Sequence, residues 1–313
     1  MRLIVVLLGL LCCTALLISA VPLSPQDQED VRGAFLTSRP KEKSSTSSAT
    51  SKPSRRRPRP VSADNKNTGS DNKNINVDNK GTNTNLDNYK TKSENQGTKP
   101  APVNAQRLGL GLTLFMRDSN GLAVRTEPSR VFQKGDRVRV LLETNTDGYI
   151  YIFNTTNDGP PVMIYPNADL DEAGNYLQAH VPFEIPSSLS AEERLRWLAF
   201  DENAGNERLF FVFTKEPLSG LPIEDDLIAL CRDSKSSCPV KPGADVWAQV
   251  EKQSKQPLLS SASAQNGQAQ TQTEQQASTR GLGLAKSDPE PSMIMMASSK
   301  TSTLVTTLDL IHK

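Results

Sequence analysis

Histidine and cysteine are scarce in this 313-residue chain. It contains two histidines, four cysteines and two tryptophans, and aromatic residues make up only 5% of it. So few histidines and cysteines exclude most multi-residue metal sites and argue against a histidine-based catalytic centre. With 36% apolar residues overall, the low aromatic content predicts that part of the chain cannot bury enough surface to fold.

The usual catalytic and nucleotide-binding motifs are also missing. There is no Gly-x-x-x-x-Gly-Lys-Ser/Thr phosphate loop and no Gly-x-Ser-x-Gly nucleophile elbow. Gly109-Leu110-Gly111 lacks the third glycine of a dinucleotide fingerprint. His180 and His312 lie far apart in the sequence, and we expect both to be hydrogen-bonded surface groups. We therefore expect no enzyme activity, no catalytic residues, no cofactor and no metal site.

The first twenty residues have the pattern of a secretory signal peptide. Met1-Arg2 precedes an apolar run over residues 3–18, and small residues follow at Ser19-Ala20. We predict cleavage after Ala20 and export to the periplasm or the outside of the cell. An uncleaved anchor is the alternative, because residues 3–21 reach the lower end of a membrane-spanning length.

Removal of a signal peptide leaves only two cysteines, Cys231 and Cys238. In an oxidising compartment such a pair tends to form a disulfide. Closing so short a loop contributes about 2–3 kcal/mol in the chain-entropy model. We predict a structural disulfide, with two free surface thiols as the alternative.

Residues 21–106 are predicted to form a disordered, low-complexity arm. Residues 41–106 contain only ten apolar residues, and residues 41–60 carry a net charge of +6. Residues 64–88 are rich in asparagine and repeat the pattern Asp-Asn-Lys. The basic stretch suits an anionic surface such as lipid headgroups or wall polymer, or is simply a solvated linker. Nucleic acid is not expected as a partner, since no aromatic platform accompanies the candidate contacts Arg55, Arg56, Arg57 and Arg59.

Strand-like alternation begins at Arg107, where leucines alternate with smaller residues. Turn signals such as Asp147-Gly148 separate the candidate strands, which favours antiparallel pairing. We predict a mainly β module over residues 107–253, an antiparallel β-sandwich or partly open barrel with two or three short helices. The first predicted strand begins at Leu108, and the other predicted strands cover residues 137–143, 148–154, 162–165, 196–200 and 208–214.

Helices are predicted at three places in or beside the module. Ser190-Ala191-Glu192-Glu193 has the form of a capping box, and residues 222–231 and 244–252 have apolar residues at helical spacing. Residues 254–279 are rich in Gln and Ser and predict a flexible loop. We expect the strand-like residues 280–313 to complete the sheet that begins at Arg107.

The segment Gly148–Asn154 is apolar on both faces, which is typical of a central strand covered on both sides. Its aromatic side chains Tyr149, Tyr151 and Phe153 share one face. The alternative is that these three residues form an exposed ladder that binds a partner.

Four runs in this part of the chain resemble a known family. They are residues 132–136, 147–154, 165–167 and 205–213, which read FQKGD, DGYIYIFN, YPN and GNERLFFVF. Their order and spacing are similar to the bacterial family catalogued as domain of unknown function 4384, over about residues 109–218. The resemblance implies an extracytoplasmic, non-catalytic β-rich module, which in other proteins is sometimes attached to kinase or caspase-like domains. That family has no established catalytic residues.

The function expected from the sequence is therefore binding. We predict an exported, non-enzymatic interaction module of the bacterial cell envelope, whose partner is a protein or an envelope polymer. A self-associating structural component, joined through an unpaired sheet edge, is one alternative. An unrecognised hydrolase using acidic pairs such as Glu192-Glu193 and Asp201-Glu202 is the other.

Overall fold

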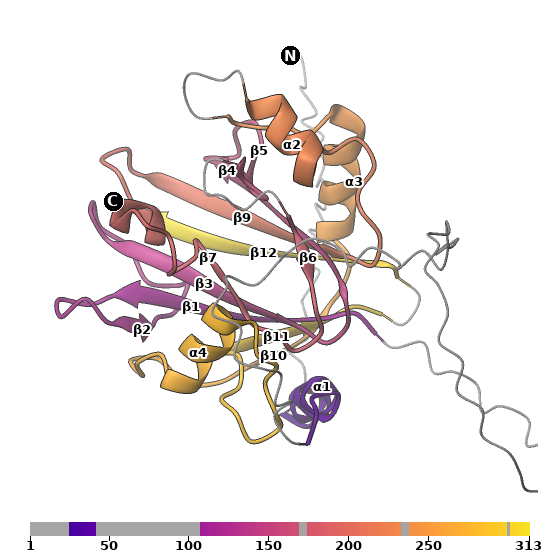
Figure 1. The fold of residues 1–313 in the computed structure, drawn as a ribbon. Coiled ribbons are helices and arrows are strands. Elements are labelled where there is room, and N and C mark those ends of the chain that lie inside the picture. Colours follow the sequence, from indigo (N-terminus) through magenta and orange to yellow (C-terminus); the bar gives the residue numbers. More distant parts are fainter. Residues whose placement is uncertain (1–24, 42–106, 169–173, 233–237, 299–300) are drawn as a thin grey trace, which may run out of the picture.

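The computed structural model describes residues 25–41, 107–168, 174–232, 238–298 and 301–313. It is mainly β: two antiparallel sheets lie face to face, with helices on the outer face of each (Figure 1). This confirms the predicted sandwich, and neither sheet closes into a barrel. The predicted signal peptide, the Asn-rich stretch and all of the basic stretch except Lys41 lie outside the described residues.

The first sheet has seven strands in the order β10-β11-β1-β3-β7. Strand β2 also pairs with β1, and β8 also pairs with β3. The strands are β1 (Gly109–Arg117), β2 (Ala123–Arg125), β3 (Arg137–Thr144), β7 (Phe183–Ile185), β8 (Leu198–Ala199), β10 (Leu259–Ala262) and β11 (Met293–Met296).

The second sheet has five strands in the order β12-β9-β4-β5, and β6 also pairs with β4. Strands β9 and β12 run antiparallel over ten consecutive residue pairs. The strands are β4 (Gly148–Thr156), β5 (Val162–Tyr165), β6 (Tyr176–Leu177), β9 (Gly205–Thr214) and β12 (Thr303–His312).

The main core fills the space between the two sheets. Leu110, Leu112 and Leu114 point into it from β1, and Ile150 and Ile152 point into it from β4. Because side chains alternate along a strand, the residues between them face the outer side of each sheet. Every predicted strand is present, although β8 has only two residues and the expected helix at Ser190 is instead a short 3₁₀ helix, η2 (Glu193–Arg196).

Helices α2 (Glu224–Cys231) and α3 (Ala244–Ser254) confirm the two predicted helices and cover the outer face of the five-stranded sheet (Figure 1). The rings of Phe153 and Trp247 are 5.9 Å apart. Tyr149, Tyr151 and Phe153 are at most 3% exposed. The alternative of an exposed aromatic ladder is therefore wrong, because the two helices bury it.

The arm predicted to be disordered begins with a packed helix, α1 (Pro25–Thr37). Val31 and Phe35 are buried against Ile294 and Met296 of β11. The glycines of β1 make this approach possible, because a Cβ on Gly111 would lie only 3.3 Å from Cζ of Phe35. The disorder prediction is thus wrong for residues 25–41, because their apolar side chains pack against a strand that lies far away in the sequence.

The loop predicted over residues 254–279 is also ordered. It contains β10 and helix α4 (Gln272–Arg280), which starts with a capping box between Thr271 and Glu274. Glu274 is 1% exposed and forms an ion pair with Arg125 of β2. The composition did not indicate this helix, because its residues are mostly polar and the contact that holds it on the sheet is a buried ion pair rather than an apolar face.

The two C-terminal strands join different sheets. Strand β11 pairs with β1, as expected for the end of the chain, but β12 pairs with β9 in the second sheet. Leu304, Leu308 and Leu310 of β12 enter the core between the sheets. The predicted disulfide is present, with the sulfur atoms of Cys231 and Cys238 2.07 Å apart.

We predict that Gly111→Ala weakens the docking of α1 and of Pro291 on β1. The new Cβ would lie 2.9 Å from Cβ of Pro291, and such overpacking costs about 1–3 kcal/mol. Gly33→Ala is the matched control, since nothing lies within 4 Å of that helical position. It should stabilise α1 by up to about 1 kcal/mol. Urea unfolding and proteolysis of α1 measure both effects, and equal stability of the two variants would contradict the packing described.

Candidate functional site

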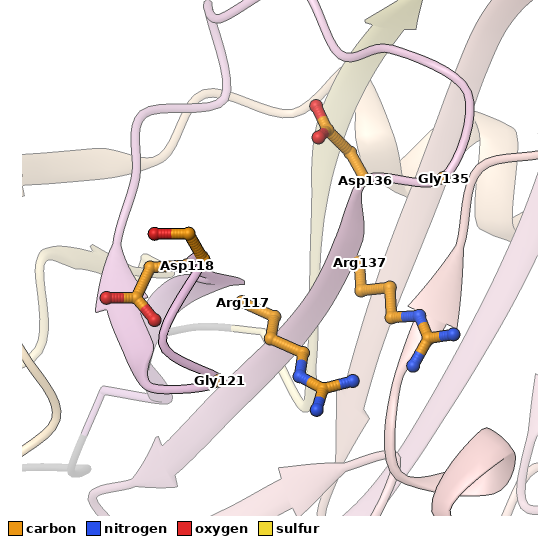
Figure 2. Close-up of a pocket in the computed structure, with 7 residues that line it drawn as sticks. Arg117, Asp118, Gly121, Gly135, Asp136 and Arg137 are labelled. Atoms are coloured by element: carbon orange, nitrogen blue, oxygen red, sulfur yellow. The ribbon is translucent and has the colours of Figure 1, made fainter.

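A polar depression opens between the ends of β1 and β3 (Figure 2). Its volume is about 350 Å³, and Arg117, Asp118, Asp136 and Arg137 line it together with Ser119 and two glycines. Figure 2 shows the two arginine side chains extending in the same direction, while the two carboxylates point away from them.

Three of the four charged side chains around this depression already have partners. The carboxylate of Asp118 accepts hydrogen bonds from the backbone N–H groups of Asn120 and Leu122, and Arg117 forms an ion pair with Glu193 at 2.8 Å. Asp136 accepts from the backbone N–H of Gln133. Two cations and two anions give no net charge that would select a ligand. We interpret the depression as the gap between two hydrogen-bonded turns.

A polar network, buried except at Ser38, joins the end of α1 to the seven-stranded sheet, and part of it has the geometry of a catalytic triad. Ser38 Oγ lies 2.8 Å from His180 Nε2, and His180 Nδ1 lies 2.8 Å from Glu143 Oε1. His180 is 3% exposed, so the expectation of a surface histidine is wrong. His312, at 4%, is buried as well.

The protons in this network do not suit a serine nucleophile. A carbonyl oxygen only accepts, so the 2.5 Å contact between Ser38 Oγ and Phe35 O takes the hydroxyl proton. While that bond is made, Ser38 Oγ can act toward His180 Nε2 only as an acceptor. A hydroxyl that donates to a carbonyl oxygen does not offer its proton to the histidine, as a serine nucleophile must.

The two backbone N–H groups nearest the Ser38 hydroxyl are also already bonded. The N–H of Ser38 is bonded to Phe35 O, and the N–H of Arg39 is bonded to Leu36 O. These are the amides that would normally stabilise a tetrahedral intermediate. We therefore interpret the network as a clasp that holds α1 on the sheet.

Arg39 completes this clasp. Its guanidinium donates twice to the carboxylate of Glu143, at 2.8 and 2.6 Å, and also reaches the carbonyl oxygens of Ala285, Asp288 and Pro289. Burial alone raises the pKa of Glu143, but the hydrogen bonds from His180 and Arg39 outweigh it and hold that pKa below its usual value.

This depressed pKa predicts a loss of stability in acid. Glu143 stabilises the fold fully above the ordinary carboxyl pKa of about 4.3, and the contribution is lost as the pH falls through the lower folded value. Glu143→Gln should cost about 3–5 kcal/mol at pH 7, because it leaves Arg39 buried without its anion, and should flatten the acid dependence. Urea unfolding at pH 7 and in acid measures both effects.

The matched control is Glu216→Gln. This carboxylate is exposed, so its substitution should change stability by no more than about 0.5 kcal/mol. A Glu143→Gln protein as stable as this control would show that the clasp contributes nothing.

The free edge of β12 is a different kind of site. Ile311 O accepts from the N–H of Phe132, and the N–H of Lys313 donates to Phe132 O, so these odd-numbered residues point their backbone away from β9. Both backbone groups of a strand residue point to the same side and alternate along the strand. The N–H and C=O groups of Thr303, Val305, Thr307 and Asp309 therefore point away from β9, and within the described part of the chain no hydrogen bond is made to them. Val305 is only 2% exposed, so the accessible part of this edge consists of Thr303, Thr307 and Asp309.

Two other strand edges are bridged, β2 by Ala269 and β5 by Val240. Helices pack beside two further strands, α1 against β10 and α3 against β12. Strand β12 carries one charge, Asp309, and no proline or lysine among its ten residues. Exposed edges usually carry such residues to prevent pairing, so β12 is open to an added strand.

A half-open cleft lies at one end of the space between the sheets. Its volume is about 200 Å³. Its lining is apolar except for Asn154 of β4 and Glu207 of β9. The apolar lining consists of Val138, Ile164, Leu198, Ala199, Phe200, Leu209 and Leu310, which come from both sheets.

No described group of three or more His, Cys, Asp or Glu side chains is placed to hold a metal ion. Within the same residues, no helix has the length and apolar composition needed to cross a membrane. The predicted anionic-surface contacts, Arg55, Arg56, Arg57 and Arg59, fall outside the described residues.

Comparison with family models matches residues 131–217 to a domain of unknown function, DUF4384. This segment of the chain belongs to that family. It contains β3 to β9, and so includes most of the five-stranded sheet together with Asn154 and Glu207. The DUF4384 segment starts later than the resemblance predicted, since β1 lies outside it. No curated protein and no solved structure gives a significant match.

Sequence reasoning missed the β12 edge, the clasp and the two polar residues of the cleft. Only the two polar residues of the cleft left a signal in the local sequence. Asn154 follows Ile150 and Ile152 on the same face of its strand, and Glu207 precedes Leu209 and Phe211 in the same way. A polar residue at an inward position breaks the alternation, and that break marks the cleft.

Proposed function

We propose that this protein is an exported, non-enzymatic interaction module of the bacterial cell envelope, and that it binds an extended segment of a partner protein along β12. The observation that carries the proposal is the unpaired edge from Thr303 to Asp309. Strand addition supplies affinity through backbone hydrogen bonds and specificity through alternate side chains.

The edge is suited to a polypeptide rather than to a polysaccharide. Thr303, Thr307 and Asp309 offer backbone donors and acceptors along one side of a strand, which another peptide backbone matches. Thr307 and Asp309 are exposed beside it and would contact the side chains of the added strand. Among the two partner classes expected from the sequence, a protein is therefore favoured over an envelope polymer.

Two features support the location of this module outside the cytoplasm. The sequence of residues 1–20 has the three parts of a signal peptide. Cys231 and Cys238 lie at disulfide distance, and such bonds persist in oxidising compartments. The periplasm and the cell exterior both satisfy these features, as does a protein held by an uncleaved N-terminal segment.

We predict that Thr307→Pro abolishes strand addition while preserving the fold. The N–H of Thr307 points to the free edge, so proline removes no bond to β9. Thr307→Val keeps the N–H and serves as the matched control. Retention of the full mature chain in native envelope fractions should be at least about tenfold weaker for the proline variant and unchanged for the valine variant. Equal retention of both variants would exclude the edge as the binding site.

Self-association through the same edge is the second candidate, because two β12 strands can pair antiparallel with Thr303 opposite Asp309, without opposing like charges. Analytical ultracentrifugation of the purified chain distinguishes the two. A dimer that the Thr307→Pro variant cannot form supports self-association, whereas a monomer at high concentration supports a separate partner.

The basic stretch of residues 41–60 supports a further, electrostatic contact with an anionic surface. We expect envelope retention to fall as salt is raised to about 1 M, where the Debye length shrinks to about 3 Å. Replacing Arg55, Arg56, Arg57 and Arg59 by glutamine should lower retention at low salt in the same way. Retention unaffected by salt and by these substitutions would leave the stretch a solvated linker.

A further inference from the structure

Two half-buried polar side chains continue the inward faces of their strands at the end of the sandwich. Asn154 continues the inward face of β4 after Ile150 and Ile152, and Glu207 lies on the same face of β9 as Leu209. Both line the cleft between the sheets, whose remaining walls are apolar. A polar group at such a position needs a partner, because burial without one costs free energy.

These two side chains satisfy each other only in part. Asn154 Nδ2 donates to Glu207 Oε2 at 2.7 Å, and Thr156 Oγ1 donates to the same oxygen at 2.8 Å. A carboxylate only accepts, so this contact fixes the orientation of the amide. Asn154 Oδ1 is then left buried without a hydrogen-bond donor. Within the described chain, no cationic side chain forms an ion pair with Glu207.

We propose that the cleft binds an alkyl chain that ends in a primary ammonium group. The ammonium carries a positive charge and three N–H donors, and the carboxylate of Glu207 can accept its hydrogen bonds. The alkyl stem would lie on the apolar walls. A cavity of about 150 Å³ holds a benzene molecule, so the volume of about 200 Å³ suits a stem of five or so carbons. The charge of Glu207 disfavours carboxylate and phosphate ligands.

This chemistry has two sources, the side chain of a lysine in a polypeptide and a free alkylamine. The inference does not depend on strand addition at β12, since the cleft lies between the sheets rather than along the free edge. Loss of binding at one site would therefore leave the other testable.

The experiment is an NMR titration of the ¹⁵N-labelled mature chain with n-pentylammonium chloride. We expect saturable shifts of the amide signals of Asn154 and Glu207. At equal ionic strength, n-pentanol should bind at least about tenfold more weakly and pentanoate should not bind, because neither supplies a charge-assisted donor. Nα-acetyl-lysine amide tests the polypeptide source: its binding assigns the cleft to a lysine side chain, and binding of the amine alone assigns it to a small molecule.

Two variants and one control locate the site. Glu207→Gln should weaken pentylammonium binding at least about tenfold, while Glu202→Gln, an exposed carboxylate on the preceding turn, should not change it. Ala199→Phe tests the cleft independently, because this exposed position lets a ring fill the opening without entering the core. The proposal is overturned if pentylammonium causes no saturable shift, if n-pentanol binds equally well, or if both variants bind like wild type.

Discussion

Strands β4 and β9 run through the five-stranded sheet with apolar side chains on both faces, and neither face tolerates water. One face requires a second sheet, and the other requires a helical cover. The leucines of β1 cover the inner face, and helices α2 and α3 cover the outer face. The order of layers, helices on sheet on sheet on helices, follows from the double burial of these two strands (Figure 1).

The elements that meet this requirement lie mostly outside the DUF4384 segment. Strands β1, β11 and β12 and helices α2 and α3 all fall before residue 131 or after residue 217. Within this chain, the family segment is therefore a pair of incomplete sheets whose apolar faces are closed by the flanking sequence.

Much of the fold could be predicted because its signals are local. Alternation at Leu110–Leu114 and Ile150–Phe153, with turns between the strands, predicts the sandwich, and helical spacing predicts α2 and α3. Helix α1 could not be predicted in this way, because Arg39 after it binds Glu143 across more than a hundred residues. Helix α4 has local signals, the capping box at Thr271 and Glu274 and Gly281 at its end, but its polar composition outweighed them, and its ion pair with Arg125 is long-range. The sheet that β12 joins is likewise decided by long-range packing of Leu304 and Leu308.

The candidate sites escaped prediction for a related reason. An edge exists only relative to the neighbours that fail to cover it, so no property of Thr303–Asp309 alone distinguishes β12 from a central strand. The cleft differs, because Asn154 and Glu207 break a pattern that is visible within their own strands. Their mutual hydrogen bond lowers the cost of that break, but within the described chain it leaves Asn154 Oδ1 without a donor and Glu207 without a cation, beside apolar walls. A cationic donor carried on an apolar stem complements both the carboxylate and these walls.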